Sequence, residues 1–124
     1  MSGARPVVLL VDDEAHILSA LQRVLRREPY EVLTSTSPPE ALALLAARVI
    51  AVVVSDQKMP GVSGIEFLRE VAQRFPATRR ILLTVWPEEI PAREREAARL
   101  DAILPKPWDE AQLKATLARC VAGG

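Results

Sequence analysis

Carboxylate, hydroxyl and ammonium side chains stand at the ends of four short apolar stretches of this sequence. The stretches are residues 7–11, 49–54, 80–83 and 102–104, and all are rich in valine, isoleucine or leucine. Continuous apolar stretches of this length are typical of strands buried on both faces of a parallel sheet. The polar residues at their ends are Asp12, Asp13, Asp56, Thr84 and Lys106. Because the carboxyl ends of parallel strands share one edge of a sheet, we expect these side chains to converge there.

Three carboxylates at one edge favour a metal site. A single aspartate after a strand could simply cap a helix, but two such charges about 4 Å apart repel by ~4 kcal/mol at an effective dielectric constant near 20. Hard oxygen ligands without neighbouring histidine or cysteine favour Mg²⁺, which commonly pairs with a phosphoryl group. Asp56 could then be a metal ligand only, or also a nucleophile that attacks phosphorus. Thr84 and Lys106 could hold the added oxygens.

Capping signals predict where helices begin between these strands. Ser37 with Glu40, and Ser63 with Glu66, have the spacing of capping boxes. Asp109 is placed to cap a last helix that begins directly after it. The sequence therefore predicts helices after Ser37, Ser63 and Asp109, in addition to the first helix described next.

Proline and helical periodicity define the remaining elements. A first helix with apolar residues at helical spacing ends before Pro29, and residues 30–34 form a short strand. Residues 85–90 are predicted to be a proline-stiffened loop, followed by a short helix over about 91–99. That helix has little but alanine to pack, so we expect it to be the least firmly held element. Strand and helix thus alternate five times, which predicts a parallel sheet with helices on both faces.

Composition limits the class of protein. The chain has 124 residues, 49% hydrophobic and 26% charged, which suits one globular domain, expected over residues 5–122 with 123–124 as a tail or the start of a linker. A net charge of zero gives no support for nucleic-acid binding. We find no apolar stretch of membrane-spanning length and no export signal in residues 1–6, so we expect a cytoplasmic protein with no membrane partner. His16 is expected to be a solvated helix residue and Cys120 a buried thiol.

Four motifs together resemble the receiver domain of two-component response regulators, over residues 7–121. They are Val11-Asp12-Asp13-Glu14, Asp56-Gln57-Lys58-Met59-Pro60-Gly61 with Gly64, Leu82-Leu83-Thr84, and Lys106-Pro107-Trp108. The resemblance implies a flavodoxin-like, doubly wound (βα)5 fold whose five-stranded parallel sheet has the order 2-1-3-4-5.

The resemblance also implies a role for each acidic residue. Asp56 would be the phosphoacceptor, taking a phosphoryl group from a sensor histidine kinase or a phosphotransfer protein. Asp13 and Asp56 would bind Mg²⁺ directly together with the backbone carbonyl of Lys58, and Asp12 would act through a metal-bound water. The domain would not be an enzyme in the usual sense, because it would catalyse only its own phosphorylation and dephosphorylation.

Thr84 and Lys106 would hold the phosphoryl oxygens in such a domain, and the Lys106–Pro107 bond is commonly cis. The added charge would bias the surface formed by the fourth helix, the fifth strand and the fifth helix. That surface would then engage a partner, a second copy of the domain or an output domain. The motifs do not decide between a stand-alone receiver and one attached to an output domain.

Three positions depart from the family pattern. Ile103 stands where a switch aromatic often lies, and Arg99-Leu100-Asp101 lacks the usual glycine. Val85, with Trp86 beyond it, replaces a small residue that governs access to the aspartyl phosphate. We therefore expect Val85 and Trp86 to slow hydrolysis, and activation to depend more on the loop that follows the fourth strand.

Two alternatives belong to other classes of function. A pseudo-receiver would be an interaction module that works without phosphorylation, and the departures at Val85 and Ile103 fit that hypothesis. A phosphatase with an aspartyl nucleophile typically needs a second aspartate two residues after the first, where this chain has Lys58. The complete set of aspartates, threonine and lysine favours the phosphorylated receiver over both.

Overall fold

A five-stranded parallel sheet with the strand order β2-β1-β3-β4-β5 forms the centre of the fold, which confirms the predicted flavodoxin-like topology. A computed structural model of the chain describes residues 5–123. Residues 1–4, part of the segment searched for an export signal, and Gly124 of the predicted tail lie outside the described residues. The strands are β1 (Val7–Val11), β2 (Glu31–Ser35), β3 (Val52–Asp56), β4 (Arg79–Thr84) and β5 (Ala102–Pro105).

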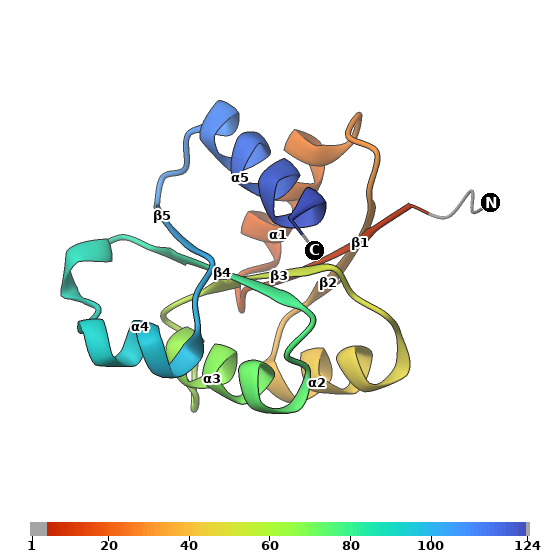
Figure 1. Cartoon of the computed structure of the whole chain (residues 1–124). Coiled ribbons are helices and arrows are strands. Elements are labelled where there is room, and N and C mark those ends of the chain that lie inside the picture. The colour runs from red at the N-terminus through yellow and green to blue at the C-terminus, as the bar shows by residue number, and fades with distance from the viewer. Residues whose placement is uncertain (1–4, 124) are drawn as a thin grey trace.

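Helices cover both faces of this sheet (Figure 1). Helices α1 and α5 lie on one face, and α2, α3 and α4 on the other, with a 3-10 turn η1 before α4. None of the helices within residues 5–123 is long and apolar enough to cross a membrane. The helical elements are α1 (Ala15–Leu25), α2 (Pro38–Ala47), α3 (Gly64–Arg74), η1 (Pro87–Glu89), α4 (Ala92–Ala98) and α5 (Glu110–Ala122).

The central strands are buried on both faces because their side chains alternate between two apolar clusters. In β1, Val8 and Leu10 pack with α1 and α5, whereas Leu9 and Val11 pack with α2 and α3. Each fully buried side chain of this kind contributes about 1.5–3 kcal/mol to folding. Packing on both faces explains why the strand sequences are continuously apolar. It also fixes the position of each strand along its own direction, and therefore where the strand ends.

Helix caps fix where the chain leaves the edge of the sheet. The capping box of Ser63 and Glu66 is complete, and Asp109 Oδ1 accepts a hydrogen bond from the N–H of Gln112 (3.2 Å). The box predicted at α2 is only half formed. Ser37 Oγ accepts from the N–H of Glu40, but the Glu40 carboxylate turns back to the N–H of Thr36 (3.1 Å) and to the Ser35 hydroxyl, so it does not reach the Ser37 N–H. The buried Ser35 hydroxyl lies 2.8 Å both from a Glu40 carboxylate oxygen and from the Ser37 carbonyl oxygen, so it is well satisfied.

Several element boundaries differ from the sequence expectation, among them that of β2, predicted over residues 30–34 and found at Glu31–Ser35. The third strand begins at Val52, because its pairing with β1 begins at Val8 and Val52, and the side chain of Val49 is 92% exposed. After β4, the expected loop contains the turn η1. The short helix expected over 91–99 is present as α4, whose only buried residue is Ala98.

Arg80, at the start of β4, is buried and fixes the C-terminal end of α4. It is 5% exposed, and its guanidinium donates to the carbonyls of Ala98 (3.0 Å) and Arg99 (3.1 Å) from one side and to the Thr78 carbonyl from the other. Arg99 occupies the left-handed conformation (φ +49°) in which the missing glycine would be favoured. The guanidinium therefore satisfies carbonyls that the end of the helix leaves without partners.

Candidate functional site

The carboxyl ends of four strands surround a cleft of about 330 Å³. Strands β1, β3, β4 and β5 each end at this edge, and the loops that follow them form its walls. The cleft brings together most of the residues that the sequence singled out, from segments up to 94 positions apart. Its lining residues are Asp13, Glu14, Asp56, Gln57, Lys58, Thr84, Val85, Trp86 and Lys106.

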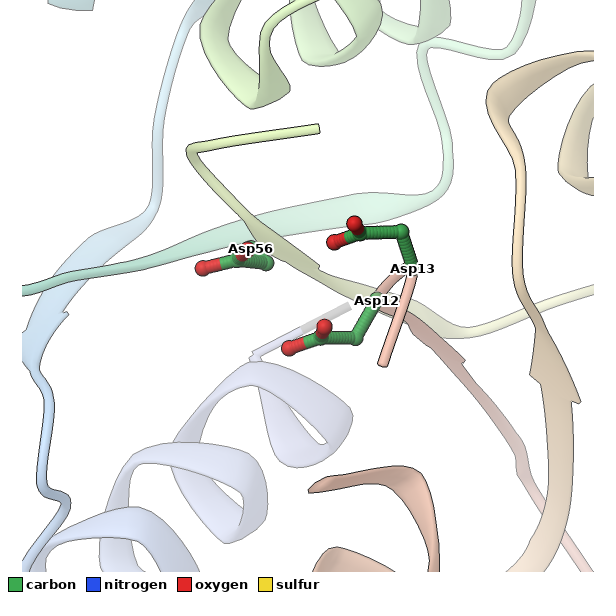
Figure 2. A group of neighbouring side chains, drawn as sticks. All are labelled: Asp12, Asp13 and Asp56. Carbon is green, nitrogen blue, oxygen red and sulfur yellow. The ribbon is translucent and has the colours of Figure 1, made fainter. Parts of the chain in front are cut away.

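Three carboxylates meet at the ends of β1 and β3. Each of Asp12, Asp13 and Asp56 offers an oxygen atom, and these atoms all lie within 4.8 Å of one another. Figure 2 shows the three carboxylate groups side by side, directed into the same space. Asp12 and Asp56 are 1% and 7% exposed, whereas Asp13 is open to solvent. The convergence expected from the strand ends is therefore present.

Lys106, just beyond β5, supplies a positive charge to this cluster. Its Nζ donates to Asp56 Oδ1 (2.8 Å) and to Asp12 Oδ2 (3.1 Å), and Asp12 Oδ1 accepts from the N–H of Glu14 (2.9 Å). Burial would lower the pKa of the Lys106 ammonium, but the two carboxylates more than offset this and raise it. Burial, together with the charge of Asp12, raises the pKa of Asp56 despite the contact with Lys106.

The cluster fits a hard divalent cation. Three carboxylates face one ammonium group, so negative charge remains in excess at a partly buried site. All the clustered donor atoms are carboxylate oxygens, which are the ligands that Mg²⁺ and Ca²⁺ prefer and zinc does not. Burial, and to a smaller extent the charge of Asp12, raise the pKa of Asp56, so its ionised form is costly in this site and a bound cation would relieve that cost. Lys58 lines the same cleft and could add its carbonyl oxygen.

The remaining predicted residues lie at the mouth of the cleft or beside it. Thr84 is buried, and its Oγ1 accepts a hydrogen bond from the N–H of Trp86 (3.2 Å). Val85 and Trp86 line the cleft and are 55% and 51% exposed. Ile103 pairs with Leu82 in the sheet and packs, partly buried, against the cluster on the α2 and α3 side.

Other candidates fall outside the cluster or were missed. The Lys106–Pro107 peptide bond is cis, as the resemblance implied, and Pro107 is exposed. His16 is solvated, with its Nε2 3.9 Å from a Glu14 carboxylate oxygen, and Cys120 is buried as expected. Sequence reasoning assigned no role to Gln57, whose side chain accepts a hydrogen bond from the first turn of α3. Only its position directly after Asp56 could have drawn attention to it.

The fold and the cleft define a class of protein: a doubly wound α/β domain with an acidic, lysine-containing site at the carboxyl edge of its sheet. The family model described as the response regulator receiver domain matches residues 8–118, and the chain belongs to this family.

Relatives and solved structures agree with this assignment. The chain is 44% identical over 110 residues to the hydrogenase transcriptional regulatory protein HoxA of Cupriavidus necator, which covers 87% of the chain but 22% of that protein. A signal receiver domain of an HD domain-containing protein from Pseudomonas fluorescens superposes with a TM-score of 0.91 at 32% identity, covering 99% of this chain and 91% of that one. The response regulator TrrA of Thermotoga maritima, solved in complex with Mg²⁺ and BeF, gives 0.84 at 29% identity, covering 93% and 98%.

Proposed function

We propose that this receiver domain accepts a phosphoryl group on Asp56 from a sensor histidine kinase or a phosphotransfer protein. The observation that carries this proposal is the cluster of the Asp12, Asp13 and Asp56 carboxylates, with the Lys106 ammonium group bound to Asp12 and Asp56. A purely structural role would not favour three carboxylates at one edge of a sheet. Donors of this kind are cytoplasmic, which is where we propose that the domain acts.

Asp56 acts as the nucleophile in this proposal. Lys106 occupies Asp56 Oδ1, so the lone pairs of Oδ2 remain for attack on phosphorus. An O–P bond forms as the N–P bond of a phosphohistidine breaks, and the departing imidazole nitrogen takes a proton. Lys106 then holds a phosphoryl oxygen, and the Thr84 hydroxyl donates to another after leaving its contact with Trp86.

The proposed cofactor is Mg²⁺, held by Asp13, Asp56 and the carbonyl of Lys58, and by Asp12 through a water molecule. When bound, it neutralises the carboxylates and the negative charge of the transferring group. We also propose that the chain catalyses only its own phosphorylation and dephosphorylation.

The phosphorylated form is expected to act through α4, β5 and α5. A phosphoryl group adds a charge of about −1.5 to −2 at the end of the sheet. The loop after β4 leads directly from Thr84 to α4, whose residues are nearly all exposed. We propose that this surface engages an output domain, a second copy or another protein partner.

Intact mass spectrometry tests the proposal directly. The protein is incubated with acetyl phosphate and Mg²⁺, and we expect one added phosphoryl group that EDTA prevents. Asp56→Ala should gain none, whereas Asp109→Asn, altered at an exposed helix cap, should behave as the wild type. If neither acetyl phosphate nor a cognate kinase adds a group, the phosphorylation-independent interaction module is the better account.

A further inference from the structure

Gln57, directly after Asp56, ties the end of β3 to its neighbours through three hydrogen bonds. Its N–H donates to the Leu83 carbonyl (3.0 Å), and its own carbonyl accepts from the N–H of Gly64 (2.8 Å). Its side-chain Oε1 accepts from the N–H of Ile65 (2.8 Å). The first N–H groups of a helix have no partner within the helix, so this side chain satisfies a donor that α3 leaves free.

The junction between β3 and α3 is also closely packed. A Cβ atom on Gly64 would lie 2.1 Å from the carbonyl oxygen of Asp56, so only glycine permits this approach. Gly64 is buried, and Gln57 is half-buried beside it. The backbone of Asp56 and the first turn of α3 therefore form one unit, and the Gln57 side chain extends the main-chain contact by one residue.

These contacts hold one end of the loop of residues 58–63. The other end is fixed by the capping box, in which the Glu66 carboxylate accepts from the N–H of Ser63 (3.0 Å). Between these points, the Lys58 carbonyl accepts no hydrogen bond from any residue in the part of the chain that the structure describes. Lys58 lines the cleft of the three carboxylates, so the two anchors constrain a carbonyl that has no other partner there.

We propose that Gln57 is a positioning residue for the cation site. By holding α3 against the end of β3, its side-chain amide keeps the Lys58 carbonyl directed at the cleft. Gln57 itself touches neither the cation nor the phosphoryl group. This inference rests on the proposed function, because the site that Gln57 positions is the proposed Mg²⁺ site.

Amide hydrogen exchange tests the contact without any metal. Gln57→Met keeps the length of the side chain but removes its acceptor, so the Ile65 amide should exchange about tenfold faster. The Glu66 amide, which donates to Ser63 Oγ, should keep its rate. Gln73→Met is the matched control, because Gln73 is exposed on the same helix. Gln57→Ala, which adds no apolar bulk, should repeat the effect of Gln57→Met.

Titration with Mg²⁺, monitored by tryptophan fluorescence, tests whether loss of this contact weakens binding of the cation. The Kd for Mg²⁺ should rise about tenfold in Gln57→Met, as is typical when a residue that orients a metal ligand is lost. Gln73→Met should match the wild type. Gln57→Glu keeps an acceptor for the Ile65 amide, so it should restore slow exchange and bind Mg²⁺ at least as tightly as the wild type.

The two arms separate failure of this inference from failure of the proposed function. If the wild-type protein does not respond to Mg²⁺, the proposed cation site is wrong. If the wild type binds Mg²⁺ and Gln57→Met binds it equally well, or if the Ile65 amide exchanges at the same rate in both, Gln57 has no positioning role.

Discussion

Lys106 Nζ lies 2.8 Å from Asp56 Oδ1, although the two residues are 50 positions apart in the sequence. The contact joins the end of β5 to the end of β3, and both side chains are largely buried, with exposed fractions of 14% and 9%. One ammonium group thus serves as the counter-charge for two buried carboxylates, Asp56 and Asp12. The free protein therefore retains an electrostatic cost at the site, and a bound cation would remove it.

This cost predicts that Asp56→Asn stabilises the metal-free protein. Burial and the charge of Asp12 raise the pKa of Asp56 above its ordinary value of 3.8, so the folded chain holds this proton more tightly than the unfolded chain does. The contribution of Asp56 to stability is therefore greatest below pH 3.8, falls as the pH rises through the raised pKa, and stays lost above it. Near neutral pH the variant should be more stable by about 1 kcal/mol, allowing for solvent screening.

Urea unfolding in EDTA, repeated at several pH values, measures this difference. The advantage of Asp56→Asn should shrink as the pH falls toward 3.8, and saturating Mg²⁺ should reverse it by stabilising the wild type alone. Asp109→Asn, at an exposed helix cap, should change little at any pH. A variant less stable than the wild type at neutral pH without metal would contradict the argument.

The edge of the sheet was predictable from the sequence because strand ends and sheet topology leave little freedom. Asp12, Asp56 and Lys106 follow apolar strands, and parallel strands end at a common edge, so their meeting needed no knowledge of side-chain geometry. The choice of hydrogen-bond partners was not predictable in this way. The Glu40 carboxylate accepts from Thr36 and Ser35, although the Ser35 hydroxyl also reaches the Ser37 carbonyl, and no spacing rule encodes this choice.

The sequence placed the start of β3 at residue 49, three residues too early, because strand pairing, like the choice of hydrogen-bond partners, depends on neighbours that are distant in the sequence. A strand begins where a neighbouring strand is available to pair with it, not where its own sequence becomes apolar. The backbone of Ala51 is already hydrogen-bonded to Val7 of β1 and to Arg79 of β4, so residues 49 and 50 are the ones that precede this pairing, although their sequence continues the same apolar pattern.

The packing of Gly64 predicts that Gly64→Ala is more damaging than Gly61→Ala. An added Cβ at position 64 meets the Asp56 carbonyl oxygen at 2.1 Å, so the backbone must shift. Gly61 has φ +84°, but a Cβ atom added there would meet nothing within 4 Å, so alanine costs only the left-handed conformation, about 1–2 kcal/mol. We expect Gly64→Ala to lose about 3 kcal/mol or more of unfolding free energy. Equal losses in denaturant unfolding would show that the close approach relaxes freely.

The buried guanidinium of Arg80 predicts a large loss of stability on substitution. Arg80→Met leaves the carbonyls of Thr78, Ala98 and Arg99 without this donor, and each unsatisfied buried group costs about 1–3 kcal/mol. We expect a loss of about 3 kcal/mol and faster amide exchange throughout α4. Arg74→Met, which removes an exposed pair with Glu70, should cost about 0.5 kcal/mol. Unchanged exchange in α4 would argue against Arg80 as its anchor.

Val85 is predicted to slow the loss of the phosphoryl group. Its side chain lines the cleft beside Asp56, where it would obstruct a water molecule approaching the phosphorus. In Val85→Ala, the aspartyl phosphate should therefore be hydrolysed several-fold faster, and the transfer of a phosphoryl group from acetyl phosphate should also be faster. The matched control is Val62→Ala, because Val62 is a similarly exposed valine that does not line this cleft. Decay of the phosphorylated form, followed by intact mass, measures both variants, and unchanged rates in Val85→Ala would refute the prediction.

Trp86 is predicted to sense whether the Thr84 hydroxyl contacts its N–H or a phosphoryl oxygen, and to pass that change on to the loop before α4. The Thr84 hydroxyl accepts from the N–H of Trp86 at 3.2 Å, so a turn of Thr84 toward a phosphoryl oxygen removes that acceptor and displaces the loop leading to α4. Ile103, packed beside Leu82, offers no aromatic ring to swing in response. The loop after β4 is therefore the direct route from the cleft to α4.

Fluorescence of single-tryptophan variants checks this relay. In Trp108→Phe, Mg²⁺ with beryllium fluoride should change the emission of Trp86, and the change should vanish in Trp86→Phe. Thr84→Ser keeps the hydroxyl, so its fluorescence should respond like that of the parent protein. Thr84→Val has no hydroxyl that could leave Trp86 and bind the phosphoryl mimic, so its fluorescence should respond weakly. Because Thr84→Val is nearly isosteric, a full response in that variant would mean that Trp86 senses the ligand directly and that Thr84 does not drive the loop.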